Sequence, residues 1–241
     1  MGVWLDPGFW TYYFDSIFAK RITFFCDSIL TRVLPTFESI AQEADRLANQ
    51  EFERFGHLPV TDENVDLADF AETAQGIGLE YFDVMTGTRQ AVLNYATAGL
   101  YHMLEQQLLL FHRRQVLSSS EENNVKLLKL SELKARLADG GICIDKLPSW
   151  PKIDELRLVA NTVKHGEGDS AMRLREIRPD LFVPPSLRAE IFTVGKDGKT
   201  RHMPWYGEDL FVGSDDLRDN KDAALRFWSE FGQLILEKGA G

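Results

Sequence analysis

The stretch that most constrains the fold is residues 88–116, which has the pattern of one long helix. Leucine, tyrosine, methionine and phenylalanine cover most of its surface, so we expect neighbours on several sides of the helix. The same stretch carries Asn94, His102, Glu105 and Gln106, and such side chains are rare inside a bilayer. It is therefore predicted to be a packed helix of a soluble protein and not a membrane span.

Helical patterns also dominate the rest of the chain, and proline and glycine divide them. We predict one kinked helix or two successive helices over residues 7–55, with the break next to Pro35. Three glycines between residues 76 and 87 predict a second break, ahead of the strong helix at 88–116. Further helices are predicted over residues 125–138, 153–165 and 215–237, with loop, short helix and loop between 166 and 182.

Residues 188–205 have a different pattern. The segments "AEIFTV" and "KTRHMP" flank "GKDG", whose Asp-Gly pair is typical of a tight hairpin turn. The prediction is thus an all-α fold, a helical bundle with a small late β-hairpin. We expect a single domain over residues 1–241.

Composition limits the classes of function. The formal net charge is −10, from 37 acidic and 27 basic residues, which argues against a broadly basic nucleic-acid surface but leaves room for a local basic site. Cys26 and Cys143 are far apart and form no zinc-binding spacing, so we expect no metal and no cofactor. They suit a reducing compartment, although one disulfide stays open. Since the N-terminus lacks a secretory pattern, we expect a soluble, cytoplasmic protein without membrane contact.

A cluster of polar residues lies at the end of the helix predicted over 153–165, in the sequence "NTVKHGEGDS". On a helical wheel Arg157, Asn161, Lys164 and His165 share the side opposite the apolar residues, and Gly166 ends the helix. A histidine can act as general acid or base near neutral pH, and the cations can hold a phosphate. The ordinary alternative is a solvated polar face with basic residues at a helix C-terminus.

A second polar stripe lies on the strong helix. His102, Glu105, Gln106, His112 and Arg113 fall within about a third of the wheel. This stripe is either a solvated face or a strip that finds partners on another helix. We expect Glu105 to meet one of the cations of the 153–165 helix, with His102 and Arg113 as further supporting residues.

The segment "ELRLVANTVKHGEG" resembles the signature helix of the HEPN superfamily, α-helical proteins of toxin–antitoxin and phage-defence systems. The family motif is an Arg, a polar residue such as Asn, and a His four to six residues later. By this resemblance His165 corresponds to the motif histidine and Arg157 to the motif arginine. Asn161 and Lys164 match a variant "NxxKH" form. Seven residues separate Arg157 from His165, one more than the family pattern has.

The resemblance implies a homodimeric bundle whose two motifs form one composite site for metal-independent RNA cleavage. In that chemistry His165 moves a proton at the 2′-hydroxyl or the 5′-oxygen, and Arg157 or Lys164 stabilises the phosphate charge. The expected function is an RNA-cleaving toxin or antiviral defence effector. The alternative, suggested by the Arg157 spacing and the net acidity, is an inactive helical module that binds a partner protein or a nucleotide.

Overall fold

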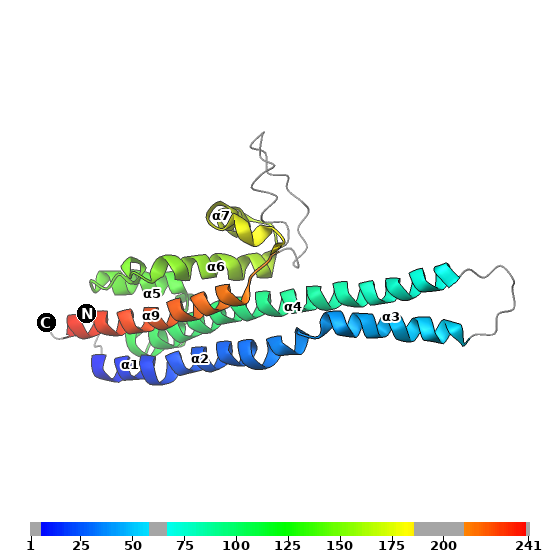
Figure 1. Cartoon of the computed structure of the whole chain (residues 1–241). Coiled ribbons are helices and arrows are strands. Elements are labelled where there is room, and N and C mark those ends of the chain that lie inside the picture. The colour runs from blue at the N-terminus through cyan, green and yellow to red at the C-terminus, as the bar shows by residue number, and fades with distance from the viewer. Residues whose placement is uncertain (1–5, 58–66, 186–209, 240–241) are drawn as a thin grey trace. The chain divides into compact units, whose positions relative to one another are not determined.

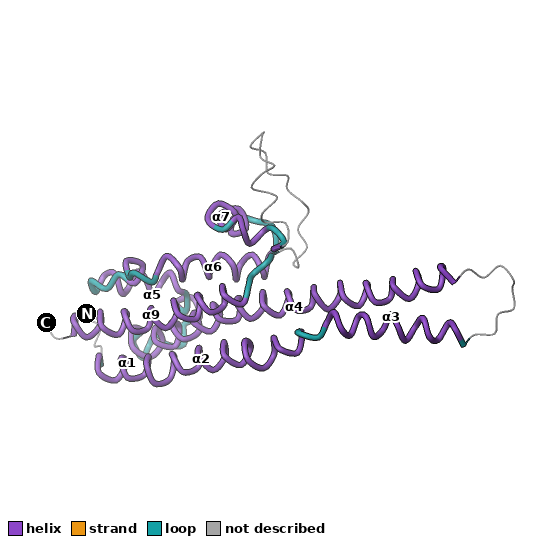
Figure 2. Tube along the Cα trace, viewed as in Figure 1, coloured by secondary structure: helices purple, strands orange, loops and turns teal. Residues whose placement is uncertain are grey.

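The structure is a computed structural model that describes residues 6–57, 67–185 and 210–239. Helices form most of these residues, and no strand occurs among them (Figures 1 and 2). The all-α class is therefore confirmed for this part of the chain. The β-hairpin expected at 188–205 lies outside the described residues. None of the described helices combines the length and apolar character needed to cross a membrane.

The chain divides into two compact units. Unit 1 contains Met1–Ser28 and Leu93–Gly241, and unit 2 contains Ile29–Val92. The prediction of a single domain stays a prediction. The α-helices are α1 (Pro7–Tyr13), α2 (Ala19–Ser28), α3 (Ile40–Gly56), α4 (Leu67–Phe111), α5 (Leu130–Asp139), α6 (Trp150–His165), α7 (Asp169–Ile177) and α9 (Ser214–Gly239).

Unit 1 is built on α9, which packs against α1, α2 and α6 (Figure 1). At its centre Trp228 of α9 is fully buried, with ring centroids 4.6 Å from Phe14 and 4.8 Å from Phe18. The indole Nε1 of Trp228 donates a 2.9 Å hydrogen bond to Oε1 of Gln107 on α4. Buried aromatic pairs of this kind contribute beyond their buried area, so this cluster is the main core of the unit.

The aromatic N-terminal segment is divided between core and surface. Trp10, Phe14 and Phe18 are buried. Phe9 and Tyr12 are exposed instead, because they lie on the side of α1 turned away from α9.

Unit 2 contains a hairpin of two helices, α3 and the first part of α4. Gly78 of α4 lies against α3 so closely that an added Cβ would be 2.8 Å from the backbone oxygen of Ala44. Phe55 and Phe70 stack with a centroid distance of 4.8 Å, and the Tyr81 hydroxyl donates to the Glu43 carboxylate. Small and aromatic side chains therefore join the two helices.

The predicted break of α4 at its glycines is wrong, because α4 runs without interruption from Leu67 to Phe111. Glycine costs a helix about 1 kcal/mol relative to alanine, but Gly78 also permits the close approach of α3. The break at Pro35 is confirmed. There a short 3-10 segment, Leu34–Phe37, separates the helical segments before it from α3.

The region that carries the polar cluster is held together by α6, α7 and α9. Leu158 and Val159 of α6 pack in one core cluster with Leu174 of α7. Beside it the Arg178 guanidinium forms ion pairs of 2.7–2.8 Å with Glu155, Asp180 and Asp216. These contacts set the position of α7 beside the C-terminal half of α6.

Candidate functional site

The C-terminal turn of α6 presents Lys164 and His165 to solvent. The helix stops here because Gly166 adopts a positive φ of 68°, a conformation that glycine tolerates without strain, while its N–H still donates to the Thr162 carbonyl at 2.8 Å. An exposed imidazole beside an ammonium group is able to exchange protons with a bound anion. The sequence prediction of a polar helix end is therefore matched by the geometry.

Arg157 lies two turns before this end, where its Nε donates to Oδ1 of Asp154 at 2.7 Å. The Cα atoms of Arg157 and His165 are about 12 Å apart along the helix axis. Since the ion pair draws the guanidinium toward Asp154, it points away from His165. A single phosphate group therefore does not reach both side chains of one α6.

Asn161 lies between these two residues and connects α6 to α7. Its Nδ2 donates a 3.4 Å hydrogen bond to Oγ of Ser170. Arg173, one turn further along α7, pairs with Oδ2 of Asp154 at 3.5 Å. Sequence reasoning missed Ser170 and Arg173, although the short glycine turn between α6 and α7 is a signal that residues on both helices lie close together.

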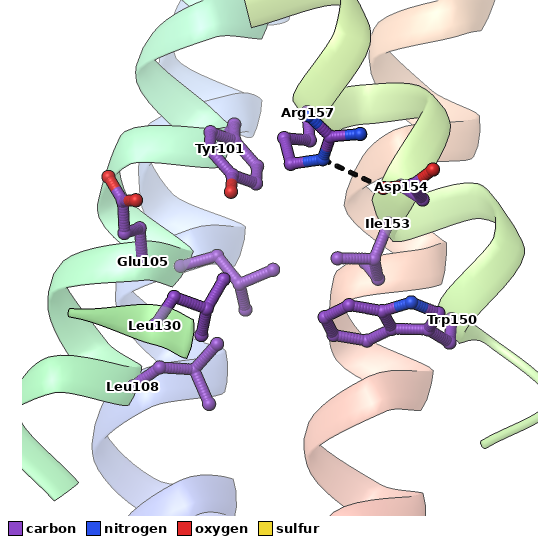
Figure 3. A pocket seen from close by; sticks show the side chains of 9 residues that line it. Tyr101, Glu105, Leu108, Leu130, Trp150, Ile153, Asp154 and Arg157 are labelled. Carbon is purple, nitrogen blue, oxygen red and sulfur yellow. Dashed lines mark hydrogen bonds and ion pairs between the residues drawn. The ribbon is translucent and has the colours of Figure 1, made fainter. Parts of the chain in front are cut away.

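One residue of each predicted polar set, Glu105 and Arg157, lines a pocket between α4, α5 and α6 (Figure 3). The pocket has an empty volume of about 250 Å³, including space open to solvent. In Figure 3, Arg157 and Asp154 lie on α6 opposite Tyr101 and Glu105 of α4. Its lining residues are Tyr101, Leu104, Glu105, Leu108, Leu130, Trp150, Ile153, Asp154 and Arg157.

Ion pairs within each helix hold the charged groups of this pocket. Glu105 lines the same pocket as Arg157, but its carboxylate lies 3.7 Å from Nδ1 of His102 on its own helix. Arg157 pairs with Asp154 instead of Glu105. Burial, and secondly the Glu105 charge, raise the pKa of Tyr101 to about 12, so its hydroxyl stays protonated and is a hydrogen-bond donor at neutral pH.

His112, directly after α4, differs from the other members of the second polar stripe. His102, Gln106 and Arg113 are exposed, whereas His112 is fully buried. Neither ring nitrogen of His112 has a hydrogen-bond partner, and burial lowers the pKa of this histidine. Arg113 does not line the pocket.

The described ranges contain no group of three or more His, Cys, Asp or Glu side chains placed to hold a metal ion. Comparison of the chain with family models, curated proteins and solved structures finds no match.

Proposed function

We propose that this chain is a metal-independent ribonuclease of the HEPN type, with His165 as its catalytic residue. The observation that carries the proposal is the exposed end of α6, where Lys164 and His165 stand beside Asn161. The defence or toxin role belongs to the same proposal, because cleavage of cellular RNA arrests growth.

Metal-independent RNA cleavage needs a proton-transfer group and a cation near the phosphate, the roles proposed here for His165 and Lys164. The 2′-hydroxyl of the RNA attacks the adjacent phosphorus, the bond to the 5′-oxygen breaks, and the products carry a 2′,3′-cyclic phosphate and a 5′-hydroxyl. The His165 imidazole takes the proton from the 2′-hydroxyl or gives one to the 5′-oxygen. Lys164 stabilises the charge that develops on the phosphate oxygens, since Arg157 is drawn toward Asp154.

A homodimer completes the proposed site. The long separation of Arg157 from His165 prevents one chain from placing both groups on the same phosphate. Two copies that meet at their α6 helices supply two histidines, one for each proton transfer. In this arrangement the Arg157 side chain of one copy faces the His165 side chain of the other.

The test is cleavage of labelled RNA by the purified protein in the presence of EDTA. Wild type is expected to produce 2′,3′-cyclic phosphate ends, and His165→Ala is expected to lower the rate by about 100-fold or more. His57→Ala serves as the matched control, because His57 is also an exposed histidine at the C-terminal end of a helix, α3. No cleavage by wild type, or equal rates for wild type and His165→Ala, would contradict the proposal.

The alternative function is a catalytically inactive HEPN-like module that binds a protein or a nucleotide. The ion pair between Arg157 and Asp154 favours it, because this pair occupies the cation that the motif needs. Asp154→Asn releases the guanidinium. If neither wild type nor Asp154→Asn cleaves RNA at high protein concentration, the inactive module is the better description.

A further inference from the structure

The α3–α4 hairpin, meaning α3 with residues 67–92 of α4, exposes more apolar surface than two helices can bury between them. Leu79 is 61% exposed, Val84 58%, and Phe82 45%. These values contrast with Ala74 and Gly78 on the same helix, which are covered by α3. Large apolar side chains of this kind mark a surface that binds something when they occur together.

The helical wheel explains how they are distributed. Taking the direction of Ala74 and Gly78 as the side that faces α3, Leu79 and Phe82 fall on one flank of α4. Ile77 and Val84 fall on the opposite flank. The first part of α4 is therefore apolar on three sides, and only one of them is covered within the hairpin.

Phe52 of α3, 45% exposed, lies on the same side of the hairpin as Leu79 and Phe82. The two helices are antiparallel. Side chains that lie at a similar angle from the α3–α4 contact on each helix therefore project from the same face of the hairpin. We call Phe52, Leu79 and Phe82 the apolar face of the hairpin. A third helix laid along this face would bury all three side chains.

The charge of the hairpin limits what that third helix can be. The hairpin carries eight acidic side chains, three arginines and no lysine, a formal charge of −5. Glu72 and Asp83 are exposed and lie next to Leu79 on the helical wheel. Two copies of this surface would repel each other, and nucleic acid is excluded for the same reason.

We infer that the apolar face of the α3–α4 hairpin binds a basic amphipathic helix of a partner protein. Its leucine-type side chains would cover Phe52, Leu79 and Phe82, and its lysines or arginines would pair with the flanking carboxylates such as Glu72 and Asp83. This is the helix-in-groove mode of recognition. The inference is independent of RNA cleavage, because it uses none of the residues of α6.

The test uses a fluorescent 21-residue peptide with leucine at helical i, i+3, i+4 and i+7 spacing and lysine elsewhere, titrated with the full chain. A peptide of the same composition in scrambled order controls for charge alone. The ordered peptide is expected to bind at least tenfold more tightly than the scrambled one, and its binding is expected to weaken as salt rises.

Two variants locate the binding site. Leu79→Ser with Phe82→Ser is expected to raise the Kd of the ordered peptide at least tenfold, and Glu72→Lys with Asp83→Lys by about tenfold. Val125→Ser is the control, since Val125 is an exposed apolar residue of unit 1, outside the hairpin. Circular dichroism and urea unfolding confirm that each variant is folded.

Three outcomes would overturn the inference: equal affinity for the two peptides, no effect of the Leu79 and Phe82 substitutions, or a dimer in light scattering that these substitutions dissociate. The last result would assign the face to a second copy of the chain. RNA cleavage by the same variants separates this inference from the proposed nuclease, since the substitutions should leave that activity unchanged.

Discussion

The two units of the chain use similar helices in different surroundings. In unit 1, α9 has neighbours on several sides, and Phe227, Trp228 and Phe231 are all fully buried. In unit 2, α3 and the first part of α4 have each other, and Leu79 and Phe82 stay exposed. An apolar helix surface is therefore buried in a core only where enough other helices surround it. Where they do not, it remains exposed and available for binding.

The largest expected effect comes from removing the central ring of unit 1. Trp228→Ala should lower the free energy of unfolding by about 3–5 kcal/mol, because it leaves a cavity and deprives Gln107 of its indole donor. Phe82→Ala, in unit 2, should cost less than about 1 kcal/mol. Urea unfolding followed by circular dichroism measures both. Similar losses for the two variants would contradict the view that the core of unit 1 is better packed than the exposed face of unit 2.

A second, smaller effect is expected from the buried charges of unit 1. Arg178→Gln should cost about 1–3 kcal/mol, because Glu155 and Asp216 lose a charged donor while their side chains are only 15% and 19% exposed. The control is Arg218→Gln, whose partner Asp215 is 91% exposed, with an expected cost of about 0.5 kcal/mol or less. Equal losses for the two variants would show that partial burial of the Arg178 ion pairs adds nothing to the free energy of unfolding.

A matched pair of glycines sharpens the picture of unit 2. Gly78→Ala should destabilise the protein by about 1 kcal/mol net, since a Cβ collides with the Ala44 carbonyl and this outweighs the gain in helix propensity. Gly76→Ala meets no atom within 4 Å and should stabilise by about 0.5–1 kcal/mol. Thermal unfolding of the two variants distinguishes them by the sign of the change in Tm.

The smallest expected effect is the pH dependence that His112 adds to unit 1. Burial lowers its pKa in the folded state, so between that pKa and the ordinary value near 6.5 the unfolded chain binds more protons. The free energy of unfolding is therefore higher above about pH 6.5 and decreases as the pH falls below it. His112→Leu should reduce the difference between the urea midpoints measured at pH 8 and pH 5.

Much of the helical order was predictable from local signals. Pro35 marks the break before α3, and Gly166 ends α6 where predicted. The continuity of α4 was not predictable, because the value of Gly78 lies in the approach of α3, which is distant in sequence. Helix propensity describes the chain's own backbone and says nothing of the neighbour that a missing side chain admits.

The candidate site was predictable in its residues and not in its partners. The wheel placed Arg157, Asn161 and His165 on one face of α6, since that depends only on 100° per residue. The pairing of Arg157 with Asp154 and of Asn161 with Ser170 depends on rotamers and on where α7 packs. The same applies to His112, which shared a polar stripe in sequence and is buried in the fold.

The helical class, the break at Pro35 and the polar end of α6 could be predicted from the sequence, because each follows from interactions within a few residues. The tertiary structure alone decided which polar groups are buried, which charges pair, and which apolar faces are covered. These depend on how many helices surround a given side chain, and residues far apart in the chain supply those helices. The buried Trp228 and the exposed Phe82 are the two extremes of that dependence.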